Sequence, residues 1–386
     1  MKRNNIAFYV VVGLIIISVV VFGFVLGPGK SMIRESKFKD YAAPVSGAGT
    51  GFYRHCYEEL NENEQLFYRV LVAELYTQPD KIQVPQLKDG DLSKVFKAIS
   101  YDNPDLFNLG LNCKMYKSGN DYFFEPEYAL DYKVYKAQLE NVQKVADDII
   151  SRASIYKTDY EKEKFVHDYI IDHCTYMDPQ EESNRNTMYG CLVEGKASCE
   201  GYSRAFQYIM SKLNIDNRLI TGDASDDGEK YIPHMWNFVT IDGKSYYTDI
   251  TWDDPKGDAA ILRHTYFNLN TEEVLRNHKN IEQTVAECTH SEHNYFVKEF
   301  LHITTGSGEA FKSAISNGVF AAVQKKQKGV EFRFPNIAVM EQAKNSLFNT
   351  GVIYDVFEDA GVIEDTDETT VAFMTDDAMN TICIFF

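Results

Sequence analysis

The hydrophobic pattern of the chain begins with an uncharged apolar stretch from Ile6 to Leu26, which follows Lys2 and Arg3. A stretch of about 20 such residues is long enough to cross a bilayer, so it predicts an N-terminal transmembrane helix within residues 1–26. A signal peptide is the alternative interpretation, but its apolar region is usually shorter, and no Ala-x-Ala-like cleavage site follows closely.

Two further segments precede the central part of the chain. Residues 27–50 are rich in Gly, Pro, Ala and Ser and predict a flexible stalk. Residues 51–128 contain helical and strand patterns in turn, which predicts an N-terminal mixed α/β extension without clustered catalytic residue types. The expected elements there are a helix from about Tyr57 to Leu75, a strand at 82–84, a helix at 92–99 and strands at 109–116 and 122–125.

Residues 129–300 carry the clearest helical periodicity and predict the central domain. Two helices are expected first, over residues 129–154 and 159–173. A third helix begins at Cys199, and one of its faces is apolar throughout, with Tyr202, Ala205, Phe206, Ile209, Met210 and Leu213.

The last part of the chain predicts a separate small domain. Residues 266–269 have the pattern of a strand, and 271–275 that of a short helix with Thr271 as its N-cap. Residues 301–386 then predict a small C-terminal α/β domain in which we identify no chemistry. Its expected elements are helices at 311–318 and 339–349 and strands at 329–334 and 381–386.

Cys199 is the first candidate for chemistry, because it opens an amphipathic helix directly after a loop containing Gly195. The N–H groups and the macrodipole at a helix N-terminus favour an anion, and hence a thiolate. A buried structural cysteine is the alternative interpretation. Cys174 and Cys191 are weaker candidates, because neither opens an amphipathic helix.

A tight β-hairpin supplies the partners of this cysteine. His234 lies near the start of an alternating strand, Asp242-Gly243 predicts the turn, and Asp249 ends the return strand. The hairpin therefore brings an imidazole beside a carboxylate. Together with Cys199, these residues form the nucleophile, base and orienting group of a catalytic triad.

These segments resemble the motifs of the transglutaminase-like superfamily, which has a papain-like fold that also occurs in peptidases and peptide N-glycanases. The resemblance is carried by CEGYSRAF at 199–206, HMWNFV at 234–239 and YYTDITWDDP at 246–255. MYGCLVEGK at 188–196 precedes the cysteine as in many Gram-positive members, whereas Ser198 stands where an apolar residue is common. The close match covers residues 160–270, and the flanks resemble more loosely those of membrane-anchored Firmicutes members.

The resemblance implies an α+β fold with a papain-like transglutaminase core, in which the nucleophile helix packs on an antiparallel sheet. It assigns Cys199 as the nucleophile, His234 as the general base and acid, and Asp249 as the group that orients the imidazole. With the short N-terminal tail, it also favours a bacterial single-pass membrane protein with an extracellular catalytic body. Basic residues after the apolar stretch, such as Lys30 and Arg34, compete with this orientation under the positive-inside rule.

The expected reaction is attack of the thiolate on a carboxamide or peptide carbonyl of a protein or cell-wall peptide. The backbone N–H of Cys199 and a second donor near Tyr189 would hold the oxyanion. Trp236 and Trp252, the two tryptophans, flank the site and would exclude water or contact substrate, with core packing as the alternative. We rank hydrolysis slightly above transamidation, because the calcium-loop motif of animal crosslinking enzymes is absent from the sequence.

Composition excludes some functions and leaves others open. The net charge of -18 and the lack of a basic block argue against binding nucleic acid. The proposed chemistry needs no cofactor. Cys288, His290 and His293 are close enough in sequence to suggest a metal site, but a fourth zinc ligand is not evident, so we predict none. Seven cysteines allow three disulfides and one free thiol, or several free thiols, and we predict no pairing.

Two other functions remain open at this point. The first is a surface binding module that keeps a transglutaminase-like scaffold but has lost its chemistry. The second is a structural or assembly protein. Neither the oligomeric state, the acyl donor nor the acceptor can be read from the sequence.

Overall fold

The computed structural model describes residues 19–21, 36–38, 40–47, 49–88, 90–177, 184–254, 261–362 and 371–386. These residues form two compact units. The first comprises the chain up to Thr221 together with Ile232–Phe238, and the second comprises Gly222–Tyr231 and Val239–Phe386. The division crosses two strands of the predicted central domain and therefore does not follow the predicted domain boundaries.

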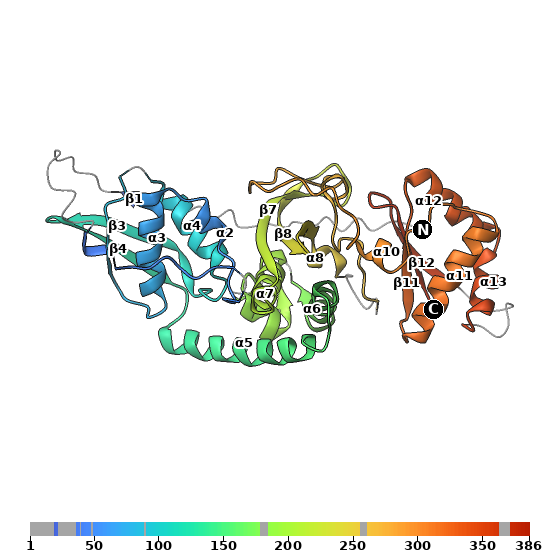
Figure 1. The fold of residues 1–386 in the computed structure, drawn as a ribbon, viewed down its shortest axis with the longest axis horizontal. Coiled ribbons are helices and arrows are strands. Elements are labelled where there is room, and N and C mark those ends of the chain that lie inside the picture. Colours follow the sequence, from blue (N-terminus) through green and yellow to red (C-terminus); the bar gives the residue numbers. More distant parts are fainter. Residues whose placement is uncertain are drawn as a thin grey trace. The chain divides into compact units, whose positions relative to one another are not determined.

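The N-terminal part of the first unit is a four-stranded sheet with the order β1-β3-β4-β2. β1 (Val19–Val21) is parallel to β3 (Leu109–Ser118), whereas β4 (Asp121–Tyr128) is antiparallel to both β3 and β2 (Ile82–Val84). The short helix α2 (His55–Glu58) precedes α3 (Glu62–Leu75) and α4 (Leu92–Asp102), and Figure 1 shows the latter two beside the sheet. Apolar residues of these helices and of β2, β3 and β4 share one core.

The predicted transmembrane segment lies almost entirely outside the described residues. The three residues of it that are described, Val19–Val21, form a strand instead of a helix. Among the residues with a described structure, no helix has the length and apolar character needed to span a membrane.

The described part of the predicted stalk is packed instead of free. η1 (Ser36–Phe38) places the ring of Phe38 in the N-terminal core, where it is 7% exposed. The hydroxyl of Tyr41 donates to a carboxylate oxygen of Glu74 at 2.8 Å. The N-terminal extension therefore begins earlier along the chain than residue 51.

Three helices form most of the rest of the first unit, and their bounds follow the sequence prediction closely. α5 (Tyr132–Ala153) packs against α6 (Asp159–His173) and α7 (Cys199–Lys212), and Figure 1 shows it passing below them. α6 begins at its predicted residue because Thr158 and Glu161 form a capping box. The short strands β5 (Thr175–Tyr176) and β6 (Lys196–Ala197) pair in parallel just before α7.

A second four-stranded sheet has the order β10-β7-β8-β9. β7 (Asp216–Ala224) was not predicted from the sequence, whereas β8 (Ile232–Ile241) and β9 (Lys244–Thr248) form the predicted hairpin. Asp242 and Gly243 both have positive φ, at 51° and 75°, as a type I′ turn requires. β10 (His278–Lys279) is antiparallel to β7.

Two local predictions after the hairpin were wrong. Residues 266–269 do not form a strand, and only Leu269 makes an isolated bridge, to Tyr247. The N-cap of α9 (Thr271–Val274) is Asn270, not Thr271, because the Asn270 side chain accepts from the backbone N–H of Glu273 in a capping box. Two further short helices, α8 (Ile250–Asp253) and α10 (Tyr295–Lys298), complete this region.

The C-terminal part of the second unit is an α/β body. Its antiparallel sheet has the order β11-β13-β12, and Figure 1 shows the helices beside these strands. β12 and α13 were not predicted. The elements are α11 (Glu309–Gln324), β11 (Gly329–Arg333), α12 (Ile337–Lys344), the π-helical turn η3 (Asn345–Asn349), α13 (Val352–Asp359), β12 (Ala372–Asp376) and β13 (Thr381–Phe385).

Candidate active site

Cys199 is the first residue of α7, as the sequence predicts. The Ser198 side chain before it does not cap the helix, because its hydroxyl donates to the side-chain oxygen of Asn186 at 2.6 Å. The positive end of the helix dipole is thus not screened by a capping side chain. Cys199 is only 3% exposed and packs with Tyr101, Leu219 and Met235.

The loop before Cys199 is held by two glycines that no other residue could replace without strain. Gly195 has a φ of 68° and ends the π-helical turn η2 (Gly190–Glu194) in the left-handed conformation. Gly201 lies in the first turn of α7, where a Cβ would come 2.3 Å from the carbonyl oxygen of Arg185. These close approaches place the first residue of α7 against the preceding loop.

β8 carries His234 beside the start of α7. The hydroxyl of Ser203 donates to the carbonyl oxygen of Met235 at 3.0 Å, and the side-chain amide of Asn237 donates to the carbonyl oxygen of Ser203 at 3.1 Å. Met235, the neighbour of His234, packs against Cys199. β8, the strand that carries the predicted base, is therefore joined to the helix that the predicted nucleophile opens.

The N-terminal extension contributes to the surroundings of Cys199, which the sequence did not indicate. The ring of Tyr101, at the end of α4, belongs to the same cluster as Cys199. Arg204 of α7 donates to the carbonyl oxygen and the hydroxyl of Ser100, and Gln207 donates to the carbonyl oxygen of Tyr101. These hydrogen bonds join α4 to the nucleophile helix.

Asp249 lies in the second unit, directly after β9, and is 3% exposed. Its Oδ1 accepts from the backbone N–H of Trp252 at 3.2 Å, so it is the N-cap of α8. Its Oδ2 lies 3.0 Å from Nε2 of His278, which is fully buried. His278 was not predicted from the sequence, because 29 residues separate it from Asp249 and no local pattern connects the two.

The other predicted site residues have more varied surroundings. Trp236 is fully buried, and the His234 ring stacks on it with centroids 5.8 Å apart. The Trp252 ring lies partly exposed against Tyr266 and His278, with centroids 5.1 Å and 4.8 Å apart. The Tyr189 ring stacks on Phe107. The roles of these three residues toward a substrate stay predictions.

All seven cysteines are free thiols. Burial raises the pKa of Cys113 and of Cys288 to about 11, and it also raises the pKa of Cys56 and Cys383. Of the two weaker nucleophile candidates, Cys174 follows the end of α6 and Cys191 lies within η2. Neither cysteine lies at the N-terminus of a helix.

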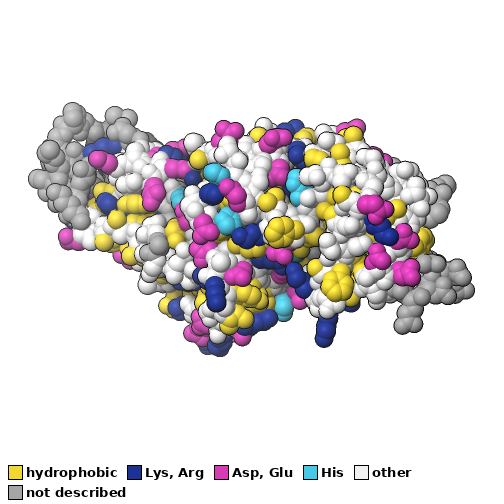
Figure 2. All heavy atoms as spheres, turned by 45° about the vertical axis from the view of Figure 1, so that its right-hand side comes forward, with side chains coloured by type: hydrophobic (Ala, Val, Ile, Leu, Met, Phe, Trp, Pro, Cys, Tyr) yellow, Lys and Arg dark blue, Asp and Glu magenta, His cyan; other side chains and the backbone are white. Residues whose placement is uncertain are grey.

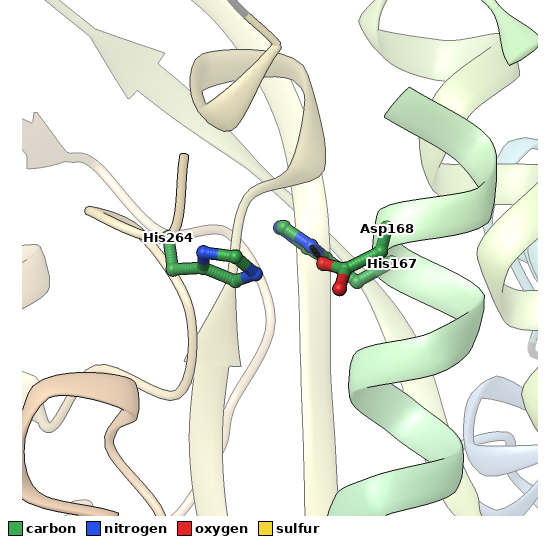
Figure 3. A group of neighbouring side chains, drawn as sticks. All are labelled: His167, Asp168 and His264. Carbon is green, nitrogen blue, oxygen red and sulfur yellow. Dashed lines mark hydrogen bonds and ion pairs between the residues drawn. The ribbon is translucent and has the colours of Figure 1, made fainter. Parts of the chain in front are cut away.

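The segment that suggested a metal site does not gather its ligand atoms. Cys288 is buried and faces the carbonyl oxygen of Ala286, whereas His290 and His293 pair with Glu292 and Asp242. Figure 3 shows His167 and Asp168 at consecutive positions of α6, with Nδ1 and Oδ1 3.1 Å apart. His264, also labelled there, belongs to the second unit, where its ring stacks on Tyr295.

Comparison with known proteins gives one family match. Residues 143–249 match the model of the transglutaminase-like superfamily, and this segment contains Cys199, His234 and Asp249. No curated protein matches the chain.

Three solved structures are similar over part of the chain. A crystal structure of a TGase is 16% identical over 45% of this chain and 52% of that chain, with a TM-score of 0.26. A proposed cysteine protease from Cytophaga hutchinsonii is 12% identical over 36% of this chain and 61% of that chain, with a TM-score of 0.26. A proposed protease from Parabacteroides distasonis is 11% identical over 36% of this chain and 35% of that chain, with a TM-score of 0.20. The match thus spans less than two thirds of each of these structures.

Proposed function

Because residues 143–249 match the model of the transglutaminase-like superfamily, we propose that this chain is a cysteine acyl-transfer enzyme with Cys199 as its nucleophile. One observation carries the proposal. Cys199 opens α7, and the hydrogen bonds from Ser203 to the carbonyl oxygen of Met235 and from Asn237 to the carbonyl oxygen of Ser203 join that helix to β8, the strand of His234. A thiol at a helix N-terminus beside an imidazole has the arrangement that generates a thiolate nucleophile.

The third member of the proposed triad is Asp249, and the hairpin register supports it. The hydroxyls of Thr240 and Ser245 lie 3.0 Å apart, so these residues face each other across the type I′ turn. From this register we infer that Asp249 faces Trp236 across the hairpin. Side chains of facing residues lie on the same side of a sheet, and His234, two residues from Trp236, shares that side.

The first half of the proposed reaction forms a thioester. The Cys199 thiolate attacks the carbonyl carbon of a carboxamide or peptide, and the backbone N–H of Cys199 with a donor near Tyr189 holds the oxyanion. As the new C–S bond is completed, the C–N bond breaks. The protonated His234 gives its proton to the departing amine, and Asp249 holds the imidazole in the orientation that this transfer needs.

The second half releases the acyl group. His234 takes a proton from water, the resulting hydroxide attacks the thioester carbonyl, and the C–S bond breaks to leave the carboxylic acid and the thiolate. An amine in place of water gives transamidation. We rank hydrolysis first, because the calcium-loop motif of animal crosslinking enzymes is absent from the sequence.

We propose that the acyl donor is a protein or a cell-wall peptide. The net charge of -18 supports a partner other than nucleic acid. On the face shown in Figure 2, basic side chains are interspersed with acidic ones and no broad basic patch is visible.

Hydroxylamine trapping tests the proposed reaction. The full chain is incubated with a mixture of denatured proteins and cell-wall peptides in the presence of hydroxylamine, which intercepts a thioester as a hydroxamate. We expect hydroxamates that depend on Cys199 and are lost in Cys199→Ala. Equal amounts with both proteins would contradict an acyl-enzyme at this residue.

The alternative function, a binding module with vestigial chemistry, is favoured by the burial of Cys199, which is 3% exposed. Under this alternative, labelled peptides or cell-wall fragments would bind the chain and dissociate unchanged. Equilibrium binding with product analysis by mass spectrometry separates the two functions.

The location of the catalytic body is a separate proposal, supported by residues 6–26 of the sequence alone. We propose that this stretch anchors the chain in the cell membrane with the body outside. The full chain should then stay in the membrane fraction after carbonate extraction, whereas a chain without residues 1–26 should not. Complete extraction of the full chain would contradict the anchor.

A further inference from the structure

The carboxylate of Asp249 is held by a second histidine that the proposed mechanism does not use. Nε2 of His278 lies 3.0 Å from Oδ2 of Asp249, and both side chains are buried. The other carboxylate oxygen already accepts the backbone N–H of Trp252. An ionised carboxylate accepts hydrogen bonds only, so His278 donates through Nε2.

The opposite nitrogen of the same ring also faces an acceptor. Nδ1 of His278 lies 2.8 Å from Oδ1 of Asn277, whose amide nitrogen donates to the Tyr266 hydroxyl at 2.7 Å. The oxygen and nitrogen of an amide must be assigned from their hydrogen bonds. Here the assignment follows from the next contact, because the Tyr266 hydroxyl donates to Oδ2 of Asp376 at 3.0 Å.

A phenol that gives its proton to a carboxylate can only accept from Asn277, and this orients the amide with its oxygen toward His278. Burial keeps the proton on this phenol, since it raises the pKa of Tyr266 well above its ordinary value. Asp376 is in turn held by the backbone N–H of Met379, and Arg263 lies 4.0 Å from it.

We infer that His278 is a positioning residue, held with protons on both ring nitrogens, that clamps the carboxylate of Asp249. The protonation state follows from the hydrogen bonds alone. Only the effect of His278 on the reactivity of Cys199 rests on the proposed function. A neutral ring would turn one lone pair toward an acceptor, either at Asp249 or at Asn277. A doubly protonated ring donates to both acceptors. Its positive charge also pairs with the Asp249 carboxylate, whose burial without a charged partner would be costly.

The clamp reaches the C-terminal α/β body. The chain of hydrogen bonds runs from Asp249 through His278, Asn277 and Tyr266 to Asp376, which ends β12. The Trp252 ring lies over His278 at 4.8 Å between centroids and shields the pair. The C-terminal body therefore helps to set the orientation of the third triad residue, although it carries none of the proposed catalytic residues.

Nitrogen NMR of the imidazole rings tests the protonation state directly. The full chain is labelled with ¹⁵N-histidine, and the signals of His278 are identified by their loss in His278→Gln. At pH 7 we expect both ring nitrogens to show the shifts of protonated imidazolium. One protonated and one unprotonated nitrogen would overturn the inference.

Asp376→Ala tests the far end of the hydrogen-bond chain. Without the carboxylate, the Tyr266 hydroxyl can donate to Asn277, the amide can turn, and its nitrogen then faces Nδ1 of His278. We expect His278 to become neutral in this variant and to stay doubly protonated in Asp376→Asn, whose side-chain oxygen still accepts from the phenol. Unchanged spectra in both variants would show that Asp376 does not act on His278.

Alkylation of Cys199 by iodoacetamide measures the consequence for the site. We expect His278→Gln to slow it at pH 7 by at least about tenfold, the equivalent of one charge-assisted hydrogen bond. The matched control is His293→Gln, since His293 is also buried in the second unit and contacts the Tyr246 ring, but it pairs with Asp242. The control should keep the wild-type rate.

The two proposals fail in different ways. If wild-type Cys199 is no more reactive than the other thiols, the proposed function fails while the NMR result still decides the state of His278. If wild-type Cys199 is reactive and His278→Gln leaves its rate unchanged, the positioning role of His278 fails while the proposed function stands.

Discussion

The thiol of Cys199 is buried among Tyr101, Leu219 and Met235, yet its size makes it a small part of that cluster. We expect Cys199→Ala to abolish thioester formation and to lower the free energy of unfolding by only about 1 kcal/mol, the cost of losing one buried atom. Urea denaturation measures the second quantity. A loss of several kcal/mol would instead show that Cys199 is chiefly a core residue.

Asp249→Asn keeps a side-chain oxygen that can accept from the backbone N–H of Trp252. Its new amide nitrogen, however, faces Nε2 of His278, so that two donors meet where a carboxylate oxygen accepted before. We expect the rate of acyl-enzyme formation to fall by about 100-fold or more, because the orientation of the imidazole is lost. Single-turnover mass spectrometry gives the rate, and thermal unfolding shows whether the variant stays folded. A folded variant with an unchanged rate would remove Asp249 from the mechanism.

The parts of the site that the sequence predicts are those with a local pattern. Cys199 is marked by the start of an amphipathic helix, and His234 and Asp249 by a hairpin with a two-residue turn. Tyr101 and His278 have no such pattern, because the tertiary fold alone brings them to Cys199 and to Asp249.

At the level of the elements, the start of α7 depends on the absence of a side chain at Gly201. In Gly201→Ala the new Cβ would meet the backbone oxygen of Arg185 at 2.3 Å, which must displace the loop or the helix. We expect slower alkylation of Cys199 and a loss of about 1–3 kcal/mol in unfolding free energy.

Gly318→Ala is the matched control for this prediction. It also places a Cβ too close to a neighbour, 2.5 Å from the Phe332 ring, but in α11 of the second unit. It should destabilise the protein without changing the alkylation rate. Equal effects of both variants on alkylation would mean that the rate reports stability and not the geometry of α7.

We expect the contact between α4 and α7 to limit the access of reagents to Cys199. Arg204→Met removes the hydrogen bonds to Ser100 while keeping the aliphatic stem, so the Tyr101 ring should cover the thiol less tightly. We expect alkylation of Cys199 to become several-fold faster. Arg152→Met is the control, since the Arg152 side chain is 50% exposed and pairs with Asp148 on its own helix. A slower or unchanged rate in Arg204→Met would show that this contact does not limit access.

Most elements are predictable from their own residues. α6 agrees with the prediction at both ends because a capping box marks its start, and the hairpin agrees because its turn residues demand positive φ. β7 and β12 were not predicted from the sequence. In β12 the burial alternates only weakly, and its pairing with β13 selects the strand conformation.

For the molecule as a whole, the sequence predicts the class of fold better than the organisation of the chain. The predicted α+β class, the central helices and the C-terminal α/β body are all present. The predicted central domain, however, is divided between two compact units that share β7 and β8. Long-range pairing between strands decides such boundaries, and composition along the chain does not report it.

The central claim is that Cys199 and His234 form a thiolate–imidazolium pair. The most direct measurement is the pH dependence of iodoacetamide alkylation at Cys199, followed by peptide mass spectrometry in the wild-type chain and in His234→Ala. Cys113 and Cys288 serve as internal references, because burial raises the pKa of each to about 11.

We predict fast alkylation of Cys199 well below the ordinary thiol pKa of about 8.5, and loss of this advantage in His234→Ala. The contradicting result is alkylation of Cys199 no faster than that of Cys113 and Cys288, both in the wild-type chain and in Arg204→Met, in which the thiol should be less tightly covered. The binding module would then be the better account of this protein.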